Sequence, residues 1–152
     1  IAAALSVAVA AAARRVAGAR EPAPPVSYTL LDGSKSSTEA QRGKVLLVNF
    51  WATSCVSCVA EMPQIVTTHQ KFNARGYETV AVAMDYDQPA AVAHFARSRA
   101  LPFGEVARAF GDVKLTPTTF LIDKQGRVVT RYLGAPDFVA LERLIGELLA
   151  ES

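Results

Sequence analysis

The sequence predicts an α/β fold with a mixed central sheet, and two patterns of apolar residues support this prediction. Strand-length apolar runs at 26–31, 45–51 and 80–84 are separated by a turn or by longer segments with helical spacing. Later in the chain, residues 118–122 and 127–133 form two further runs joined by a short turn. Alternating strands and helices favour parallel pairing, whereas a hairpin adds an antiparallel pair. We therefore expect an α/β sandwich in which helices flank a mixed sheet.

The run at 45–51 is the best candidate for the centre of this sheet. It reads Val-Leu-Leu-Val-Asn-Phe-Trp, so Asn49 is its single polar residue. A nearly continuous apolar run is typical of a strand that is covered on both faces. The polar segment before it, 36–42, is expected to form a short helical turn.

Three helices are expected around these strands. The first follows the strand at 45–51 and ends near Asn73. The second begins at Asp87, a capping residue, and runs to about Arg99. The last begins at Asp137 and has an apolar stripe at 3–4 spacing, formed by Phe138, Leu141, Leu144, Ile145 and Leu148.

The length, charge and cysteine count exclude several classes of protein. A chain of 152 residues supports one domain of ordinary size but not two sizeable ones. The formal net charge of +2 gives no indication of nucleic-acid binding. Two cysteines exclude a multi-disulfide scaffold and a four-cysteine zinc site. They leave one bridge, one redox pair or two unrelated thiols.

Residues 1–19 differ in composition from the rest of the chain. They contain ten alanines and no acidic residue, and Ile1–Ala13 is an apolar run of 13 residues. As a helix this run would span about 20 Å, less than the roughly 30 Å hydrocarbon core of a bilayer. Residues 17–19 have the small-x-small form of a cleavage site. We expect a signal or anchor segment, cleaved or retained, with an alanine-rich helix or a disordered tail as the alternative.

A proline-rich linker is expected to join this tail to the domain. Residues 20–25 contain three prolines, which cannot continue a helix and favour an extended chain. The domain is therefore expected at 26–152. Residues 21–152 contain 13 basic and 14 acidic side chains, so the positive charge of the chain belongs to the tail.

The two cysteines lie where the buried strand gives way to a helix. In Cys55-Val56-Ser57-Cys58 the first cysteine is placed at or beside the helix N-terminus, where free N–H groups and the helix dipole favour a thiolate. The spacing allows both sulfurs to approach bridging distance in the first turn. Cys55 is therefore expected to be the exposed nucleophile, and Cys58 to resolve the mixed disulfide.

Two buried structural cysteines and half of a zinc site are the alternatives to a redox pair. The chain has two histidines. His69 would lie about 16 Å along the helix from Cys58, too far to share a metal ion with the pair. His94 is expected to be solvated or part of the core. We therefore expect no metal site.

Residues 48–63, Val-Asn-Phe-Trp-Ala-Thr-Ser-Cys-Val-Ser-Cys-Val-Ala-Glu-Met-Pro, resemble the thioredoxin superfamily. More narrowly, they are similar to its TlpA/ResA/DsbE-like branch of membrane-anchored or periplasmic proteins. The same branch is matched by Leu31-Asp32-Gly33, Gly43-Lys44-Val45, Thr116-Pro117-Thr118-Thr119-Phe120-Leu121-Ile122-Asp123 and Gly126-Arg127-Val128. The resemblance covers about 26–150 and implies a thioredoxin-like three-layer sandwich, with a mixed central sheet flanked by helices.

The resemblance also implies a substrate-binding surface around the pair. Pro117 matches the family's cis-proline, which faces the cysteines, whereas local sequence alone favours an ordinary trans proline. Such a bond leaves the backbone of Thr116 free to pair with an extended substrate segment. Trp51 matches the active-site tryptophan that shields the disulfide. The rest of the expected rim is formed by Ser54, Val56 and Ser57.

Two of these rim residues depart from the family pattern. Ser54 stands where relatives often have tryptophan, and Ser57 where they often have proline. Both changes make the rim more polar and less rigid. Because such residues help to set the reduction potential, reductant and oxidant are not distinguished by the sequence.

Glu61 is the candidate acid–base group. It lies three residues after Cys58, on the same helical face. Sequence alone favours a solvent-facing glutamate, but the resemblance implies a partly buried carboxyl near the cysteines with a raised pKa. Ordinary thioredoxins carry a buried aspartate on the preceding strand, at the position of Asn49, which cannot titrate. Glu61 is therefore grouped with Cys55 and Cys58 as catalytic.

The resulting prediction is an extracytoplasmic thiol-disulfide oxidoreductase, periplasmic or membrane-anchored. It is expected to reduce disulfides of specific partner proteins, with cytochrome c maturation as the family's best-known destination. The Cys55–Cys58 disulfide serves as redox centre without an organic cofactor, and an upstream thiol donor re-reduces it. We expect a monomer that binds no nucleic acid, with membrane attachment through the N-terminal segment as one possibility.

Three alternatives differ from this prediction in their chemistry. The first is an exchanger that oxidises its partners. The second is a copper-handling protein, because Cu(I) accepts two thiolates, although Pro117 beside the pair argues against stable metal binding. The third is a peroxidase, whose Pro-x-x-x-Thr-x-x-Cys pattern is not matched: Thr53 is two residues before Cys55 instead of three.

Overall fold

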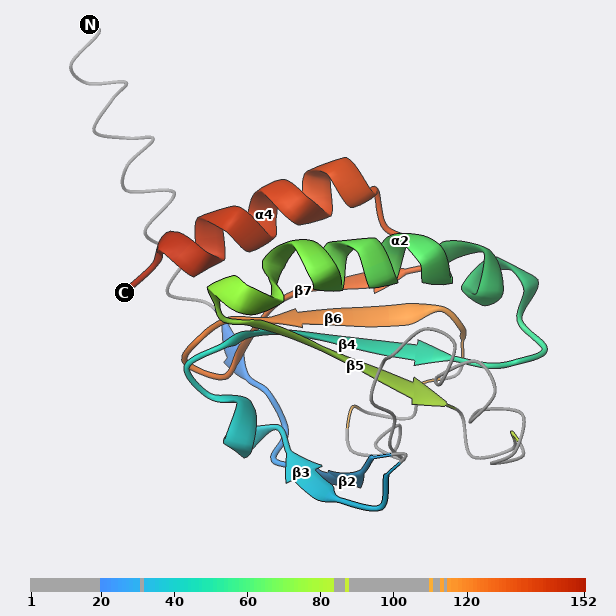
Figure 1. Ribbon diagram of the computed structural model, residues 1–152, viewed down its shortest axis with the longest axis horizontal. Coiled ribbons are helices and arrows are strands. Elements are labelled where there is room, and N and C mark those ends of the chain that lie inside the picture. The colour runs from blue at the N-terminus through green and yellow to red at the C-terminus, as the bar shows by residue number, and fades with distance from the viewer. Residues whose placement is uncertain (1–19, 31, 84–86, 88–109, 111–112, 114) are drawn as a thin grey trace, which may run out of the picture.

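A computed structural model describes residues 20–30, 32–83, 87, 110, 113 and 115–152 (Figure 1). Its larger sheet has five strands in the order β1-β7-β6-β4-β5. These are β1 (Glu21–Pro22), β4 (Val45–Trp51), β5 (Tyr77–Ala83), β6 (Thr118–Ile122) and β7 (Arg127–Leu133). A second sheet pairs β2 (Ser27–Thr29) with β3 (Lys35–Ser37). The helices are α2 (Val56–Phe72) and α4 (Phe138–Ala150), with short 3-10 turns η1 (Glu39–Gln41) and η2 (Asn73–Arg75).

Strand β4 is an interior strand of the larger sheet, between β6 and β5, as its apolar sequence predicts. It pairs in parallel with β5 and antiparallel with β6, which in turn forms a hairpin with β7. All seven of its residues are buried. The mixed sheet is therefore confirmed.

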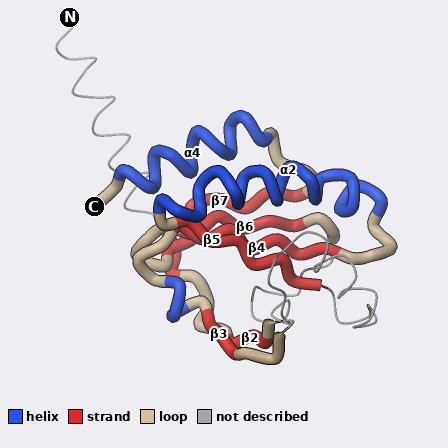
Figure 2. The backbone as a smooth tube through the Cα atoms, viewed as in Figure 1, coloured by secondary structure: helices blue, strands red, loops and turns tan. Residues whose placement is uncertain are grey.

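Side chains of β4 alternate between the two faces of the sheet, and this alternation separates the core into two sides. Helices α2 and α4 lie side by side on one face (Figure 2). That face receives Val45, Leu47 and Trp51, which pack with residues of the two helices. The opposite face receives the even-numbered residues of β4, which pack with Tyr28, Val80, Val82, Phe110, Val113, Phe120 and Ile122.

The segment before β4 differs from the prediction. The expected helical turn at 36–42 is present only as η1, because Lys35–Ser37 instead form β3 and pair with β2. This pairing holds Tyr28 over the sheet, where it is buried. The polar sequence of β3 does not predict a strand, because β3 is formed by its pairing with β2 across a turn. The expected strands at 26–31 and 80–84 also shift, to Ser27–Thr29 and Tyr77–Ala83.

The helix expected at 87–99 and the segment 101–115 lie almost wholly outside the described residues, as do the tail at 1–19 and His94. Within the described ranges, no helix combines the length and apolar character that a membrane crossing needs.

Two residues of the expected linker at 20–25 join the sheet instead of lying outside it. Glu21 and Pro22 pair with Val128 and Arg127 as the edge strand β1. Ala23 N–H donates to the Gly126 carbonyl at 2.8 Å. Pro22 is tolerated in this strand because β1 lies at the edge of the sheet, where a missing N–H donor costs little.

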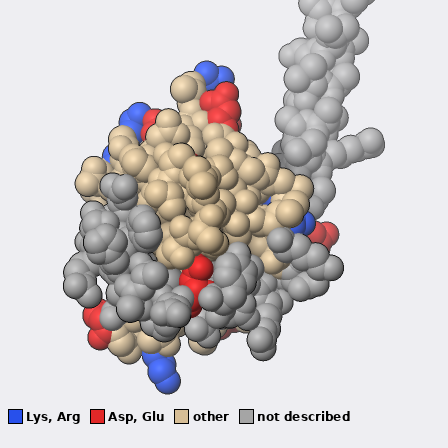
Figure 3. Space-filling view, turned by 90° about the vertical axis from the view of Figure 1, so that its right-hand side faces the viewer, with Lys and Arg blue, Asp and Glu red and all other residues tan. Residues whose placement is uncertain are grey.

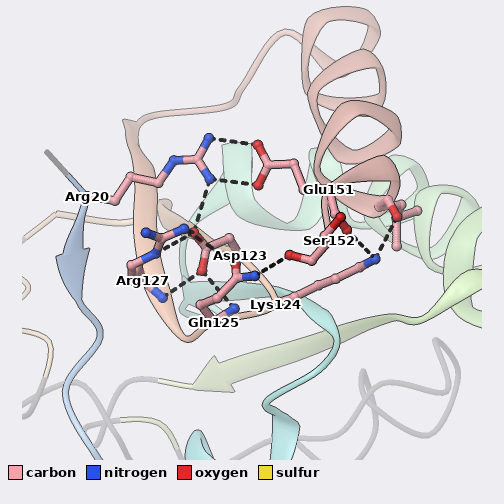
Figure 4. Close-up of polar contacts among 8 residues, drawn as sticks. Arg20, Asp123, Lys124, Gln125, Arg127, Glu151 and Ser152 are labelled. Carbon is pink, nitrogen blue, oxygen red and sulfur yellow. Dashed lines mark hydrogen bonds and ion pairs between the residues drawn. The ribbon is translucent and has the colours of Figure 1, made fainter. Parts of the chain in front are cut away.

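A network of ion pairs joins Arg20, just before β1, to Glu151, just after α4 (Figure 4). The Arg20 guanidinium donates to both carboxylate oxygens of Glu151, at 2.9 and 3.0 Å, and to Asp123 Oδ2 at 3.0 Å. The Asp123 side chain is fully buried and also accepts from Arg127 Nε at 2.9 Å. Burial alone would raise the pKa of Asp123, but the hydrogen bonds from Arg127 and Arg20 outweigh it and lower that pKa.

Replacing Asp123 with asparagine is expected to destabilise the domain by about 3 kcal/mol at pH 7, because two guanidinium groups lose their buried anion. A carboxylate with a lowered pKa stabilises the fold above its unfolded-state pKa, and this contribution is lost as the pH falls through the folded-state pKa. The native chain should therefore lose stability below about pH 4, and the loss should be smaller in Asp123→Asn. Urea unfolding at pH 7 and pH 3 measures both effects.

The matched control is Glu147→Gln, which removes a carboxylate from the exposed face of α4. It should change the unfolding free energy by less than about 0.5 kcal/mol. Equal effects of the two variants would show that the network contributes nothing specific.

Candidate active site

The cysteine pair lies at the junction of β4 and α2, as predicted. Cys55 is the N-cap of α2, and its Sγ accepts a hydrogen bond from Cys58 N–H at 3.2 Å. The Cys55 N–H donates back to the Ala52 carbonyl at 3.1 Å. A disulfide joins the two cysteines, whose Cα atoms are 5.2 Å apart. The first cysteine therefore lies at the positive end of the helix dipole, an environment that stabilises a thiolate.

The two sulfurs differ in exposure. Cys58 is fully buried and packs with Trp51, Met62 and Ile65, whereas Cys55 is half-buried. An attacking thiolate from another protein can therefore reach Cys55 more readily than Cys58. This difference agrees with the expected division into a nucleophile and a resolving cysteine.

The rim of the site is largely uncharged. Ser54, Val56 and Ser57 are exposed, and 83% of Val56 is accessible. Ser57 Oγ lies 3.5 Å from Cys55 Sγ, close enough to donate its hydroxyl hydrogen to a thiolate. Figure 3 views this side of the molecule, at which β4 and β5 end, and most of the described surface there belongs to neither acidic nor basic residues.

Thr116 lies beside the pair in the segment that precedes β6, as the resemblance implied. The Thr116–Pro117 peptide bond is cis, and the Thr116 carbonyl oxygen lies 3.6 Å from Cys55 Sγ. The Pro117 carbonyl accepts from Gly134 N–H at 2.9 Å, which ties this loop to the end of β7. Thr116 remains half-buried, so its backbone lies at the accessible edge of the disulfide.

Trp51 does not lie on the surface, contrary to its grouping with the substrate-binding residues. It is 1% exposed and packs in the same cluster as Cys58 and Met62. The reason is the alternation of β4, which directs Trp51 toward α2. The structure agrees with a shielding role beneath the disulfide, and direct contact with a partner is excluded in this conformation.

Glu61, one turn after Cys58 in α2, is buried, whereas its position in a helix alone would suggest that it faces solvent. It is 4% exposed, and its Oε1 accepts from Asn49 Nδ2 at 3.1 Å. The same Asn49 nitrogen donates to Thr119 Oγ1 at 3.0 Å. Burial raises the pKa of Glu61 to about 7, although the Asn49 hydrogen bond opposes this shift. Glu61 can therefore exchange a proton near neutral pH.

Three residues at the site were not singled out by the sequence for these roles. Thr119 and Asn49 face α2 because both strands alternate, and the interruption of an apolar run by Asn49 was the one available signal. Asp87 accepts hydrogen bonds from Thr53, two residues before Cys55. Because 34 residues separate these partners, no local pattern could have linked them.

No group of His, Cys, Asp and Glu that could hold a metal ion is found in the described part of the chain. His69 instead lies 3.2 Å from Thr79 Oγ1, between α2 and β5.

Comparisons with known proteins agree with this geometry. The sequence matches the Redoxin family over residues 18–144. The thiol-disulfide oxidoreductase ResA of Bacillus thuringiensis subsp. konkukian is 32% identical over 133 residues, which cover 83% of this chain and 76% of that protein. A solution structure from Neisseria meningitidis, assigned as a thioredoxin, has a TM-score of 0.78 and 32% identity, and covers 88% of this chain and 93% of its own. A Chlorobium tepidum structure, assigned as the thiol:disulfide interchange protein DsbE, has a TM-score of 0.77 and 27% identity, with 86% and 97% covered.

The sequence match and the fold matches each span most of the chain. In this chain the cysteine pair stands at the N-terminus of α2, and the peptide bond after the neighbouring Thr116 is cis. The chain belongs to the Redoxin family, and it is a thiol-disulfide oxidoreductase of the ResA/DsbE-like branch of the thioredoxin superfamily.

Proposed function

We propose that this protein reduces disulfide bonds of specific partner proteins outside the cytoplasm, with the maturation of c-type cytochromes as its destination. One observation carries the proposal: a half-exposed Cys55 is joined to a buried Cys58, one turn from a buried Glu61. This arrangement provides an accessible nucleophile, a protected resolving thiol and a proton acceptor. Branch resemblance favours reduction over oxidation.

The first step is attack by reduced Cys55 on a partner disulfide. The α2 N-terminus and the Cys58 N–H stabilise the Cys55 thiolate. A bond forms between Cys55 Sγ and one partner sulfur, and the other partner sulfur leaves as a thiolate. The backbone of Thr116, beside Cys55 Sγ, is placed to pair with the extended partner segment.

The second step needs a thiolate from buried Cys58, and Glu61 is the candidate acceptor of its proton. Glu61 lies on the same face of α2, and burial raises its pKa to about 7. The Cys58 thiolate attacks Cys55 Sγ, forms the intramolecular disulfide and releases the second partner thiolate. Two electrons pass to the partner, which gains two thiols after protonation.

The oxidised protein must then be reduced by a dithiol donor, which supplies two electrons and becomes a disulfide itself. The donor attacks Cys55 because Cys55 is half-buried, whereas Cys58 is fully buried. No organic cofactor takes part in either exchange, since sulfur carries the electrons throughout.

The composition of residues 1–19 supports an extracytoplasmic location, either periplasmic or anchored to the membrane. Arg20 binds Asp123, which directly follows β6. Because the last residue of β6 pairs with the start of β4, Arg20 lies at the end of the sheet where β4 begins. The disulfide follows the other end of β4. An anchor at the N-terminus would therefore leave the redox site facing away from its attachment point.

Replacing Glu61 with glutamine should change the pH profile of Cys55 reactivity and leave the fold intact. An ionised carboxylate near the pair raises the pKa of a neighbouring thiol, so removing it should lower the Cys55 pKa. The rate of iodoacetamide alkylation of the reduced protein, measured from pH 5 to pH 9, reports this shift. A profile identical to that of the native chain would remove Glu61 from the mechanism.

The same substitution should alter the pH dependence of stability in the oxidised protein. A carboxyl whose folded pKa is raised stabilises the fold at low pH and loses that contribution as the pH rises through the folded value. Native protein should therefore lose about 2–3 kcal/mol of stability between pH 4 and pH 8 that Glu61→Gln does not lose. Urea unfolding across this range measures the difference, with the exposed Glu147→Gln as control.

Replacing Cys58 with alanine should trap partners as stable mixed disulfides on Cys55, because the resolving step is blocked. Full-length protein carrying Cys58→Ala is expressed in its host, and adducts are identified by mass spectrometry. Apocytochrome or another dedicated thiol protein is the expected adduct, and Cys55→Ala should yield none. Recovery of only unrelated surface thiols would contradict a specific reductase.

A further inference from the structure

Asp87 binds the loop between β4 and α2 through both of its carboxylate oxygens. Its Oδ2 accepts the backbone N–H of Thr53 at 2.7 Å, and its Oδ1 accepts the Thr53 hydroxyl at 3.1 Å. Both residues are half-buried. Hydrogen bonds to an ionised acceptor are stronger than neutral ones, and two bonds from one residue also fix its orientation. The helix that Asp87 was expected to cap lies outside the described residues, and the two contacts of its carboxylate described here are both with Thr53.

Thr53 stands at the point where a fixed strand becomes the redox loop. The residue before it, Ala52, is buried against the sheet core and accepts the Cys55 N–H at 3.1 Å. The residue after it, Ser54, is exposed and precedes the half-buried Cys55. Cys58 is held separately, because it is fully buried in the first turn of α2. The position of Cys55 relative to Cys58 therefore depends on how firmly this loop is held.

We propose that Asp87 is a positioning residue of the redox pair: by binding Thr53 through both carboxylate oxygens, it holds Cys55 at bonding distance from Cys58 and thereby stabilises the intramolecular disulfide. The role concerns the dithiol–disulfide equilibrium of the protein itself. It goes beyond the proposed function and holds whichever partner is reduced.

The physical basis is the effective concentration of one thiol at the other. The equilibrium is protein dithiol plus glutathione disulfide giving protein disulfide plus two glutathione thiols, with two electrons and two protons passing to glutathione. A loop that holds Cys55 in place has already lost the freedom that disulfide formation would remove. Loosening the loop should therefore reduce the equilibrium constant for oxidation of the protein and make its reduction potential less negative.

The decisive comparison is between two substitutions of Thr53. Thr53→Val removes the hydroxyl bond to Asp87 Oδ1 but keeps the backbone bond, the side-chain shape and the negative charge. It should lower the oxidation equilibrium constant about threefold, or about 15 mV. Thr53→Ser keeps the hydroxyl and should match the native protein. Equilibration of full-length protein in glutathione buffers, read by thiol labelling, gives the constants.

Replacing Asp87 with alanine removes both bonds and should lower the constant on the order of tenfold, or about 30 mV. This variant also removes a negative charge, and removing a negative charge near the pair favours the thiolate forms. Its effect is therefore interpreted through a double-mutant cycle. In the Asp87→Ala background, Thr53→Val should have no further effect, because its partner is already absent. Thermal unfolding of the oxidised variants identifies any general loss of fold.

Two results would overturn the proposal. One is a native reduction potential for Thr53→Val. The other is full additivity of Asp87→Ala and Thr53→Val, which would mean that the two residues act independently. If Asp87→Ala does not fold, the comparison of Thr53→Val with Thr53→Ser still decides, since both leave Asp87 and its charge in place.

Discussion

Burial of β4 on both faces is the constraint on which the rest of the structure depends. Its neighbours β5 and β6 satisfy its backbone, and the alternation of its side chains decides what lies on each side. Apolar residues with even numbers fill the side that holds Tyr28 and Phe110. The odd-numbered residues of β4 face the helices, and they include the polar Asn49 and the large Trp51. The site is therefore assembled at the end of the same strand that contributes residues to the core on both faces of the sheet.

This placement gives the redox centre two different surroundings. Above the disulfide, Cys55 meets an exposed rim of serines and the Thr116 carbonyl. Below it, Cys58 lies among Trp51 and Met62, with Glu61 buried nearby. A buried carboxyl is costly when ionised, and its hydrogen bond from Asn49 only partly offsets that cost. The result is a group that can take a proton near neutral pH, in a region that partner proteins do not reach.

Much of the fold was predictable because its signals are local. The apolar run at 45–51, the hairpin at 118–133 and the stripe of the last helix all reappear as elements of the structure. Strand β3 and the edge strand β1 were not predicted, because both owe their form to pairing partners and not to their own composition. Residues 20–25 read as a linker, but Glu21 and Pro22 pair with β7, and Arg20 forms ion pairs with Asp123 and Glu151.

By itself, the sequence determined the spacing of the reactive groups: two cysteines at helical spacing after a buried strand, with Glu61 one turn further along. Spacing within a helix fixes such relations, so they can be read from the chain. Only the tertiary structure decided which side chains from other elements hold the residues around the pair, namely Asn49 on Glu61, Thr119 on Asn49, and Asp87 on Thr53. These contacts join residues on different elements, and their distances are set by strand order and register, which no local pattern contains.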